Sequence, residues 1–256
     1  MYRDILYKAE DGIATIALNR PEKLNSFRNQ TIVDLTKAMT AAIKDRSVGV
    51  IVITGAGGKA FSVGGDISEM RVMNKKTGAI FVRNLARLGK LFFSCPKPTI
   101  AKVNGYCIGG GNEIQLFCDL TIASDRSTFA QTGPKVGSAP LWGGSQILPG
   151  LVGMKKAKEI AFLCRHYTAA EAATIGLINQ AVSEGDLDHV VDETCRELLQ
   201  RSPQAIRLLK KSLHAGLEAQ LQKDLKNLAG IYGTAELQEG MNAFLEKRSP
   251  NFSKFR

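Results

Sequence analysis

The sequence predicts an α/β fold that ends in a helical C-terminal region. Short apolar segments rich in β-branched residues, such as 48–54, are typical of strands that are buried on both faces of a sheet. Amphipathic segments with helical spacing lie between these strands, so strands and helices alternate over short links. Near the C-terminus the pattern becomes almost entirely helical, and we place a soft boundary near residue 200.

The N-terminal part supplies most of the expected strands. Residues 2–18 predict two short strands around the turn Glu10-Asp11-Gly12. Helical spacing of apolar residues predicts a helix from about Thr31. A longer amphipathic helix is expected over 77–93, where two prolines end it. The other elements predicted here are strands over 48–54, 99–103 and 120–123, and a helix that ends at Phe117.

The C-terminal part reads mainly as helices with clear end signals. Thr168 is a good N-cap and Gly176 a good C-cap for a short helix over 169–175. Pro203 suits the first turn of a further helix, where its missing N–H costs nothing. The other elements predicted here are helices over 155–163, 186–200 and 227–247, and a last short strand over 177–182.

Composition excludes several classes of protein. The chain has 256 residues, of which 44% are hydrophobic and 23% charged, and these are ordinary globular values. No stretch approaches about 18 consecutive apolar residues, and the N-terminus does not read as a signal peptide. Five scattered cysteines without a C-x-x-C pair predict reduced thiols in a cytoplasmic protein. The cysteines and histidines do not have the spacing of a zinc site, so we expect no metal site.

The positive charge is concentrated in one part of the chain. The net charge is 34 − 24 = +10, and no acidic residue lies between Glu69 and Glu113. A basic region attracts polyanions, whether nucleic acid, a phosphate-rich cofactor or an anionic membrane. Nucleic-acid-binding motifs are missing, so we expect neither a nucleic acid nor a membrane as partner. The basic residues of this stretch are Arg71, Lys75, Lys76, Arg83, Arg87, Lys90, Lys97 and Lys102.

Two glycine-rich segments, 60–67 and 108–113, each follow a predicted buried strand, where α/β proteins place their ligands. Three glycines that open a helix expose unpaired N–H groups at its positive end. One N–H from each segment, aimed at a single oxygen, makes an oxyanion hole. The alternative is that both segments are simple tight turns. Neither fits a dinucleotide-binding or P-loop pattern, and no G-x-S-x-G nucleophile motif occurs.

These two segments, with Asn19-Arg20-Pro21 before them and 244–248 at the end, resemble the enoyl-CoA hydratase/isomerase (crotonase) family over essentially the whole chain. The resemblance implies a crotonase-type spiral of β-β-α turns with a C-terminal all-helical region. It implies an acyl-CoA-binding core over 1–200 and a helical oligomerisation region over 201–256, assembled as a homotrimer or a dimer of trimers. The substrate is then an acyl-CoA thioester, and coenzyme A enters as part of that substrate rather than as a permanent cofactor.

The same resemblance assigns site residues. Gly65 and Gly110 supply backbone N–H groups to the thioester oxygen, and Glu113 is the catalytic acid/base. Phe244 and Lys247 match positions that touch CoA from a neighbouring subunit. The further positions assigned to CoA or the acyl group are Leu24, Asp66, Ile67, Gly133, Trp142 and Tyr232.

The reaction depends on how many carboxylates the site holds. Family hydratases place a second glutamate in a segment that usually reads F-G-Q-P-E, but here residues 129–134 put Gly133 at that position. The resemblance therefore implies a lyase that hydrates an enoyl-CoA, or runs in reverse, with one glutamate. We expect Glu113 to be ionised at neutral pH, because a helix N-terminus favours its charge and no second carboxylate opposes it. The alternative is that Glu113 only caps the helix.

A second activity stays open. Residues 131–138 resemble 1,4-dihydroxy-2-naphthoyl-CoA synthase and 2-ketocyclohexanecarboxyl-CoA hydrolase, which implies an enzyme that makes or breaks carbon–carbon bonds. Those relatives commonly carry an apolar residue where Glu113 stands. Trp142 is either a wall of the acyl pocket or a core residue, and Tyr232 is either a proton donor or a packed residue. A catalytically weak CoA-binding or RNA-binding protein is the remaining alternative.

Overall fold

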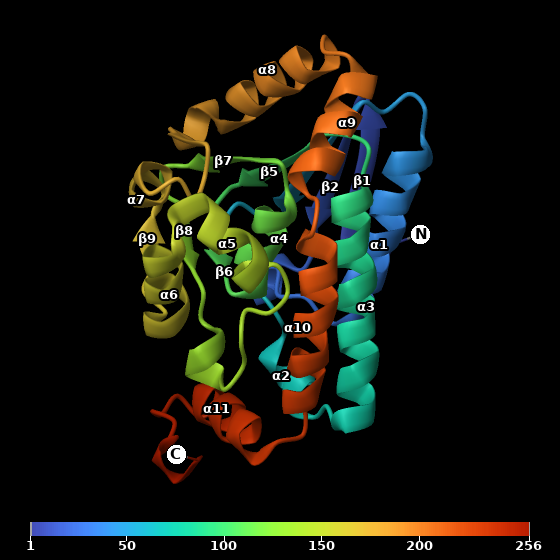
Figure 1. Cartoon of the computed structure of the whole chain (residues 1–256). Coiled ribbons are helices and arrows are strands. Elements are labelled where there is room, and N and C mark those ends of the chain that lie inside the picture. The colour runs from blue at the N-terminus through green and yellow to red at the C-terminus, as the bar shows by residue number, and fades with distance from the viewer. Residues whose placement is uncertain (1, 256) are drawn as a thin grey trace.

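Two sheets organise the chain in the computed structural model, which describes residues 2–255 (Figure 1). The larger sheet has six strands in the order β1-β2-β3-β5-β7-β10. Only β1 and β2 pair in antiparallel fashion, and the other neighbours are parallel. The predicted α/β class is therefore confirmed. The strands are β1 Ile5–Glu10, β2 Ile13–Leu18, β3 Val50–Gly55, β5 Thr99–Val103, β7 Leu120–Ser124 and β10 Gln180–Val182.

The burial of these strands explains why the sequence predicts most of them. Every residue of β3 is buried, because helices cover both faces of the sheet, and its sequence is accordingly a continuous apolar run. The last strand is shorter than the predicted 177–182. The N–H groups of Leu177 and Ile178 bond to the carbonyl of Ala172 at the end of the preceding helix, so these residues do not pair with β7.

The smaller sheet positions the site. It consists of β4 Ala60–Ser62, β6 Tyr106–Ile108, β8 Thr128–Ala130 and β9 Tyr167–Thr168. Because β4, β6 and β8 are parallel, their carboxyl ends meet at one edge of the sheet. That edge brings together the segments that follow the three strands, 63–65, 109–110 and Gln131. The sequence did not predict this sheet as separate strands, since two or three residues carry no detectable period.

Helices surround the two sheets, and α3 and α10 run side by side along one flank (Figure 1). The sequence missed α5, because two glycines at its start and Pro149 inside it read as helix breakers. The expected helix over 227–247 is interrupted at Gly233, which has a φ of 82°. The helices are α1 Asn29–Lys44, α2 Ile67–Arg71, α3 Lys75–Ser94, α4 Gly110–Phe117, α5 Gly144–Val152, α6 Met154–Leu163, α7 Ala169–Thr174, α8 Leu187–Leu199, α9 Pro203–Leu213, α10 Leu217–Ile231 and α11 Ala235–Leu245.

The C-terminal helices contribute to the same core as the sheets. Leu221, Leu225 and Leu228 of α10 are buried in the main apolar cluster. In α9, the Nζ of Lys210 lies 2.6 Å from Asp119 Oδ2, and both side chains are largely buried. The division near residue 200 remains a prediction. No helix within residues 2–255 is long and apolar enough to cross a membrane.

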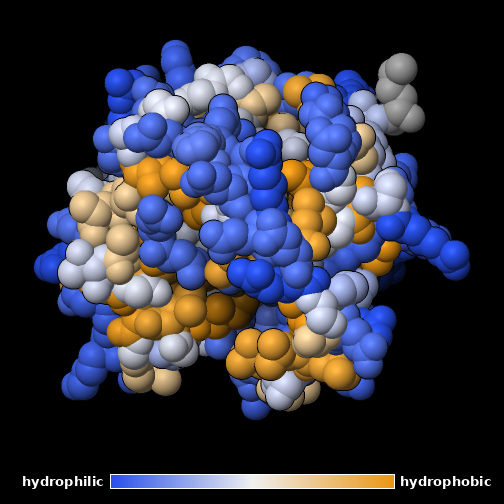
Figure 2. Space-filling model, turned by 90° about the horizontal axis from the view of Figure 1, so that it is seen from above, coloured by the Kyte–Doolittle hydropathy of each residue, from blue (hydrophilic) through white to orange (hydrophobic). Residues whose placement is uncertain are grey.

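The face of the molecule seen in Figure 2 is largely hydrophilic. Seen from above, on the side where α8 lies in Figure 1, apolar side chains gather in several patches among polar ones (Figure 2). On α9, three leucines are more than half exposed, and they are Leu208, Leu209 and Leu213.

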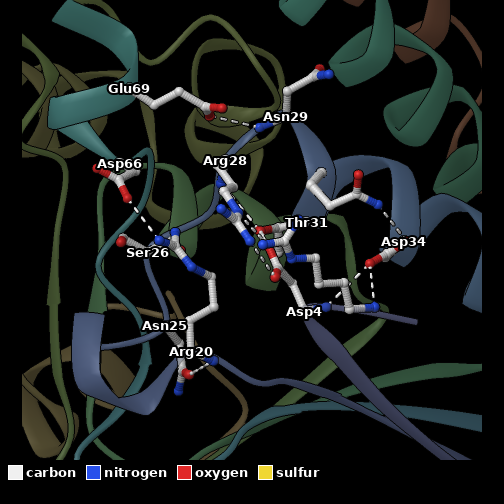
Figure 3. A network of polar contacts seen from close by, with 12 residues as sticks. Asp4, Arg20, Asn25, Ser26, Arg28, Asn29, Thr31, Asp34, Asp66 and Glu69 are labelled. Carbon is white, nitrogen blue, oxygen red and sulfur yellow. Dashed lines mark hydrogen bonds and ion pairs between the residues drawn. The ribbon is translucent and has the colours of Figure 1, made fainter. Parts of the chain in front are cut away.

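A polar network fixes the loop that carries Gly65 (Figure 3). Arg20 donates to Asp66 Oδ2 at 3.0 Å and to the Ser26 carbonyl at 2.7 Å, which ties the 19–26 segment to the start of α2. Close by, Arg28 makes a bidentate contact with the buried Asp4. Burial alone would raise the pKa of Asp4, but the hydrogen bonds from Arg28 and Thr31 outweigh it and hold the pKa below its ordinary value. Glu69 in α2 also accepts from the N–H of Asn29, the first residue of α1, at 2.9 Å, so the network links the end of this loop to α1.

Candidate active site

A cavity of about 510 Å³ opens beside the edge where the three parallel strands of the smaller sheet end. Its walls come from segments far apart in the chain, including α3, α4, α10 and α11. Apolar side chains form most of the lining, and a few polar groups face them. The apolar lining includes Phe27, Met70, Phe81, Leu85, Trp142 and Leu228.

Gly65 and Gly110 lie next to each other in this cavity. A Cβ placed on Gly64, which has a φ of 87°, would lie only 2.8 Å from the Gly110 nitrogen, so the two glycine loops touch. Phe27 holds the first loop by accepting from the Asp66 N–H and donating to the Gly64 carbonyl, both at 2.8 Å. Within residues 2–255, neither the Gly65 nor the Gly110 N–H has an acceptor. Two free backbone donors thus stand side by side.

Glu113 is buried in the wall of the same cavity. Its side chain lies in the first turn of α4, is 7% exposed, and accepts at Oε1 from the N–H groups of Trp142 at 2.9 Å and Gly144 at 3.3 Å. Burial raises the pKa of Glu113 from 4.5 to about 8, although the two N–H donors oppose the rise. The expectation that Glu113 is ionised at neutral pH is therefore wrong, because the loss of hydration on burial outweighs the two local hydrogen bonds.

Glu113 does not cap its own helix through a hydrogen bond. Its carboxylate accepts from the N–H groups of Trp142 and of Gly144, the first residue of α5, and not from the first turn of α4. A true cap in this chain looks different: Glu171 accepts from the Thr168 N–H at 2.8 Å, and the Thr168 hydroxyl accepts from Glu171 in return. The carboxylate of Glu113 is instead presented to the cavity.

Trp142 belongs both to the apolar core and to the lining of the cavity. Its indole N–H donates to the Leu85 carbonyl at 2.8 Å, and its ring packs edge-on against Phe27 with centroids 6.0 Å apart. It is 1% exposed, yet it lines the cavity. Trp142 is thus a fixed part of the cavity wall, and its backbone N–H contacts Glu113.

Tyr232 follows α10, and its ring packs over Gly78, where a Cβ would collide with it. It is buried and lines the cavity. Burial raises the pKa of Tyr232, and the nearby charge of Glu113 raises it further. The phenol therefore stays protonated and lies close to Glu113.

The remaining predicted residues divide into two groups. Asp66, Ile67, Gly133 and Phe244 line the cavity, and Asp66 is at the same time paired with Arg20 and caps α2. Two others lie outside the lining. The Leu24 carbonyl accepts from the Val63 N–H and so supports the glycine loop, and Lys247 is exposed beyond α11.

The cavity also contains residues that the sequence did not single out. None of the eight basic residues between Glu69 and Glu113 lines it. The basic side chains that do are Lys23, Lys135 and His166, which come from three separate loops. Gln131 lies in the segment 131–138 and has no assigned role in the sequence analysis, yet its buried amide belongs to the wall. Isolated residues of this kind carry no periodic or compositional signal.

Several known proteins are similar to this chain in sequence and in fold. A sequence model of the enoyl-CoA hydratase/isomerase family matches residues 8–255. An enoyl-CoA hydratase from Mycobacterium avium subsp. paratuberculosis K-10 is 28% identical, with a TM-score of 0.88 over 99% of this chain and 100% of that one. An enoyl-CoA hydratase from Bacillus anthracis is 30% identical, with a TM-score of 0.80 over 97% and 98%. An enoyl-CoA hydratase/isomerase from Xanthobacter autotrophicus Py2 is 32% identical, with a TM-score of 0.86 over 97% and 98%.

Proposed function

Because the chain belongs to the enoyl-CoA hydratase/isomerase family, we propose that it is a lyase that adds water to an enoyl-CoA, or removes it in reverse. The family match confirms the resemblance seen in the sequence, and with it the crotonase-type fold and the processing of acyl-CoA. One observation carries the finer proposal: the buried carboxyl of Glu113 shares a cavity with the two free N–H groups of Gly65 and Gly110.

The proposed mechanism uses the two glycines on the thioester. The carbonyl oxygen accepts from the Gly65 and Gly110 N–H groups, and it gains negative charge when an oxygen atom adds to the β carbon. Fixed donors stabilise that charge more than the neutral carbonyl, so they lower the barrier. The apolar lining strengthens this effect by excluding water.

Glu113 moves the proton. In its ionised form it removes a proton from water while the water oxygen bonds to the β carbon. It then delivers that proton to the α carbon of the enolate, which restores the thioester carbonyl. One carboxyl therefore serves both steps, consistent with Gly133 at the position where a second one stands in family hydratases.

The basic residues at the cavity suit the rest of the substrate. Lys23, Lys135 and His166 lie on loops in the lining, where the phosphates of CoA need positive charge. The apolar walls suit an acyl group. The proposal therefore assigns CoA binding to these three residues rather than to the basic stretch between Glu69 and Glu113.

The hydration proposal predicts a rising pH profile. Glu113 acts first as a base, and with a pKa raised to about 8 only about a tenth of it is ionised at pH 7. We expect kcat/KM for enoyl-CoA hydration, which reports the pKa of the free enzyme, to rise about tenfold per pH unit up to about pH 8 and to level off above it. Steady-state rates between about pH 6 and pH 9 check this, and a flat profile would contradict the assignment of Glu113 as base.

Carbon–carbon chemistry is the second candidate, and a specific observation favours it. Apart from Glu113, the only acidic residue in the described lining is Asp66, and Asp66 is already paired with Arg20. A panel of linear and cyclic acyl-CoAs, followed by mass spectrometry, separates the two activities. Water addition supports the hydratase, whereas ring closure, ring opening or decarboxylation without hydration supports the alternative.

We further infer a homotrimer or a dimer of trimers, with 201–256 as the oligomerisation region beside an acyl-CoA-binding core over 1–200. Exposed apolar side chains on α9 and α11, such as Leu213 and Phe244, support this assembly, because they gain free energy when a partner covers them. We expect light scattering to give three or six chains, and Leu213→Glu to shift the population to smaller species. A monomer that binds CoA fully would contradict it.

A further inference from the structure

One buried amide in the cavity wall has no partner in the protein. Gln131 follows β8 directly, lines the cavity and is 1% exposed. Its Nε2 finds no acceptor anywhere in the described range 2–255. Buried polar groups are nearly always paired, because an unpaired one lowers the stability of the fold. An unpaired amide in the wall of a substrate cavity therefore indicates a group whose partner is the ligand.

The amide lies close to Glu113. A Cβ placed on Gly144 would lie 3.2 Å from Glu113 Oε1 and 3.5 Å from Gln131 Nε2. Both side chains therefore border the same small volume next to Gly144. Gly144 carries no side chain that would fill this volume, and its N–H is already used by Glu113.

We propose that the Gln131 amide N–H donates a hydrogen bond to the oxygen that adds to the β carbon. This oxygen belongs to water in the enoyl complex and to the 3-hydroxyl group in the product complex, so the inference rests on the proposed hydration. Glu113 contacts the same oxygen as proton acceptor, and the oxygen is thus held from two sides. The last side-chain torsion of a glutamine is broad, so the amide turns to present its N–H.

The role makes chemical sense in a site with one carboxyl. A water molecule held by Glu113 alone pivots about that contact, whereas a second hydrogen bond fixes its oxygen relative to the β carbon. In the reverse direction the same N–H stabilises the departing hydroxyl oxygen. Gln131 thus provides the second polar contact that Gly133 does not supply.

The test measures binding rather than turnover. In a Glu113→Gln background, which blocks catalysis, isothermal titration calorimetry compares 3-hydroxybutyryl-CoA with butyryl-CoA. The two probes differ only in the hydroxyl group. We expect the hydroxylated probe to bind about five- to tenfold more tightly, since one buried hydrogen bond separates them. Adding Gln131→Met, which keeps the side-chain length but not the amide, should reduce that preference severalfold, because only the contact from residue 113 then remains, and should leave the affinity for butyryl-CoA nearly unchanged.

Gln115 offers a matched control. It is also 1% exposed but lies outside the cavity lining, and its amide is fully used: Nε2 donates to Asn112 at 2.9 Å, and Oε1 accepts from Thr121 at 2.6 Å. Gln115→Met should lower the melting temperature and keep the preference for the hydroxylated probe. Gln131→Met should keep or raise the melting temperature, because it removes an unpaired buried group.

The outcomes distinguish the two proposals. If the Gln131→Met protein still prefers the hydroxylated probe to the same degree, the role of Gln131 is overturned while hydration stands. If the wild-type protein fails to hydrate any enoyl-CoA in the panel, the hydration proposal is overturned, and the proposed role of Gln131 in that step is overturned with it.

Discussion

Glu113→Gln should lower kcat by about 10²–10⁴ and leave the affinity for CoA nearly unchanged. Glutamine keeps the shape of the side chain and still accepts from the Trp142 and Gly144 N–H groups, but it transfers no proton. The loss therefore falls on the chemical step rather than on binding. Rapid-quench or steady-state kinetics with the best enoyl-CoA from the panel measures it.

The same substitution should stabilise the protein. A carboxyl whose pKa is raised on folding binds its proton more tightly in the folded state, so stability falls as pH rises from the unfolded value of 4.5 towards about 8. Glutamine carries no such proton, so Glu113→Gln should raise the melting temperature at pH 7. The gain in melting temperature should grow from about pH 5 to about pH 8.

Glu171→Gln is the control, since Glu171 is a capping glutamate at the start of α7 and lies outside the cavity lining. It should leave kcat unchanged and slightly lower the melting temperature, because it weakens a cap. An active, less stable Glu113→Gln variant would behave like this control and would end the catalytic assignment.

Gly110→Pro should reduce kcat by about a hundredfold or more relative to Gly110→Ala. Proline removes one of the two N–H donors, and its fixed φ suits the first position of α4. The comparison with alanine is essential, because any Cβ at this position collides with the Phe27 ring. Both variants bear that collision, and only the proline variant lacks the donor.

The measurement is kcat for both variants, together with their melting temperatures. If the collision unfolds them, the same pair in a Phe27→Leu background relieves it, because the shorter side chain withdraws from Gly110. Equal turnover of the folded alanine and proline variants would mean that the Gly110 N–H does not bind the thioester oxygen.

The sequence predicted the larger sheet well for a physical reason. Strands such as β3 and β5 are covered on both faces, so burial leaves continuous apolar runs that are visible without a structure. The short β4, β6 and β8 leave no such run, although they create the edge on which the site is built. Helix α5 was hidden by the glycines at its start and by Pro149.

The site was predictable where a motif crosses the whole chain and unpredictable where three-dimensional burial decides. Gly65, Gly110 and Glu113 meet in one cavity as the family resemblance implied. The prediction that Glu113 is ionised was wrong, because the sequence shows that Glu113 lies near the start of a helix but does not show that folding removes the water around it. The missing partner of Gln131 is visible only once the fold closes around it.

Transfer of oxygen from labelled water shows whether the protein hydrates an enoyl-CoA with Glu113 as the base. The wild-type protein and the Glu113→Gln variant are incubated with an enoyl-CoA in H₂¹⁸O, and the product is analysed by mass spectrometry. We expect a 3-hydroxyacyl-CoA that carries one ¹⁸O at the β carbon, formed by the wild type about 10²–10⁴ times faster than by the variant. An unlabelled product, or labelled product formed equally fast by both proteins, would contradict it.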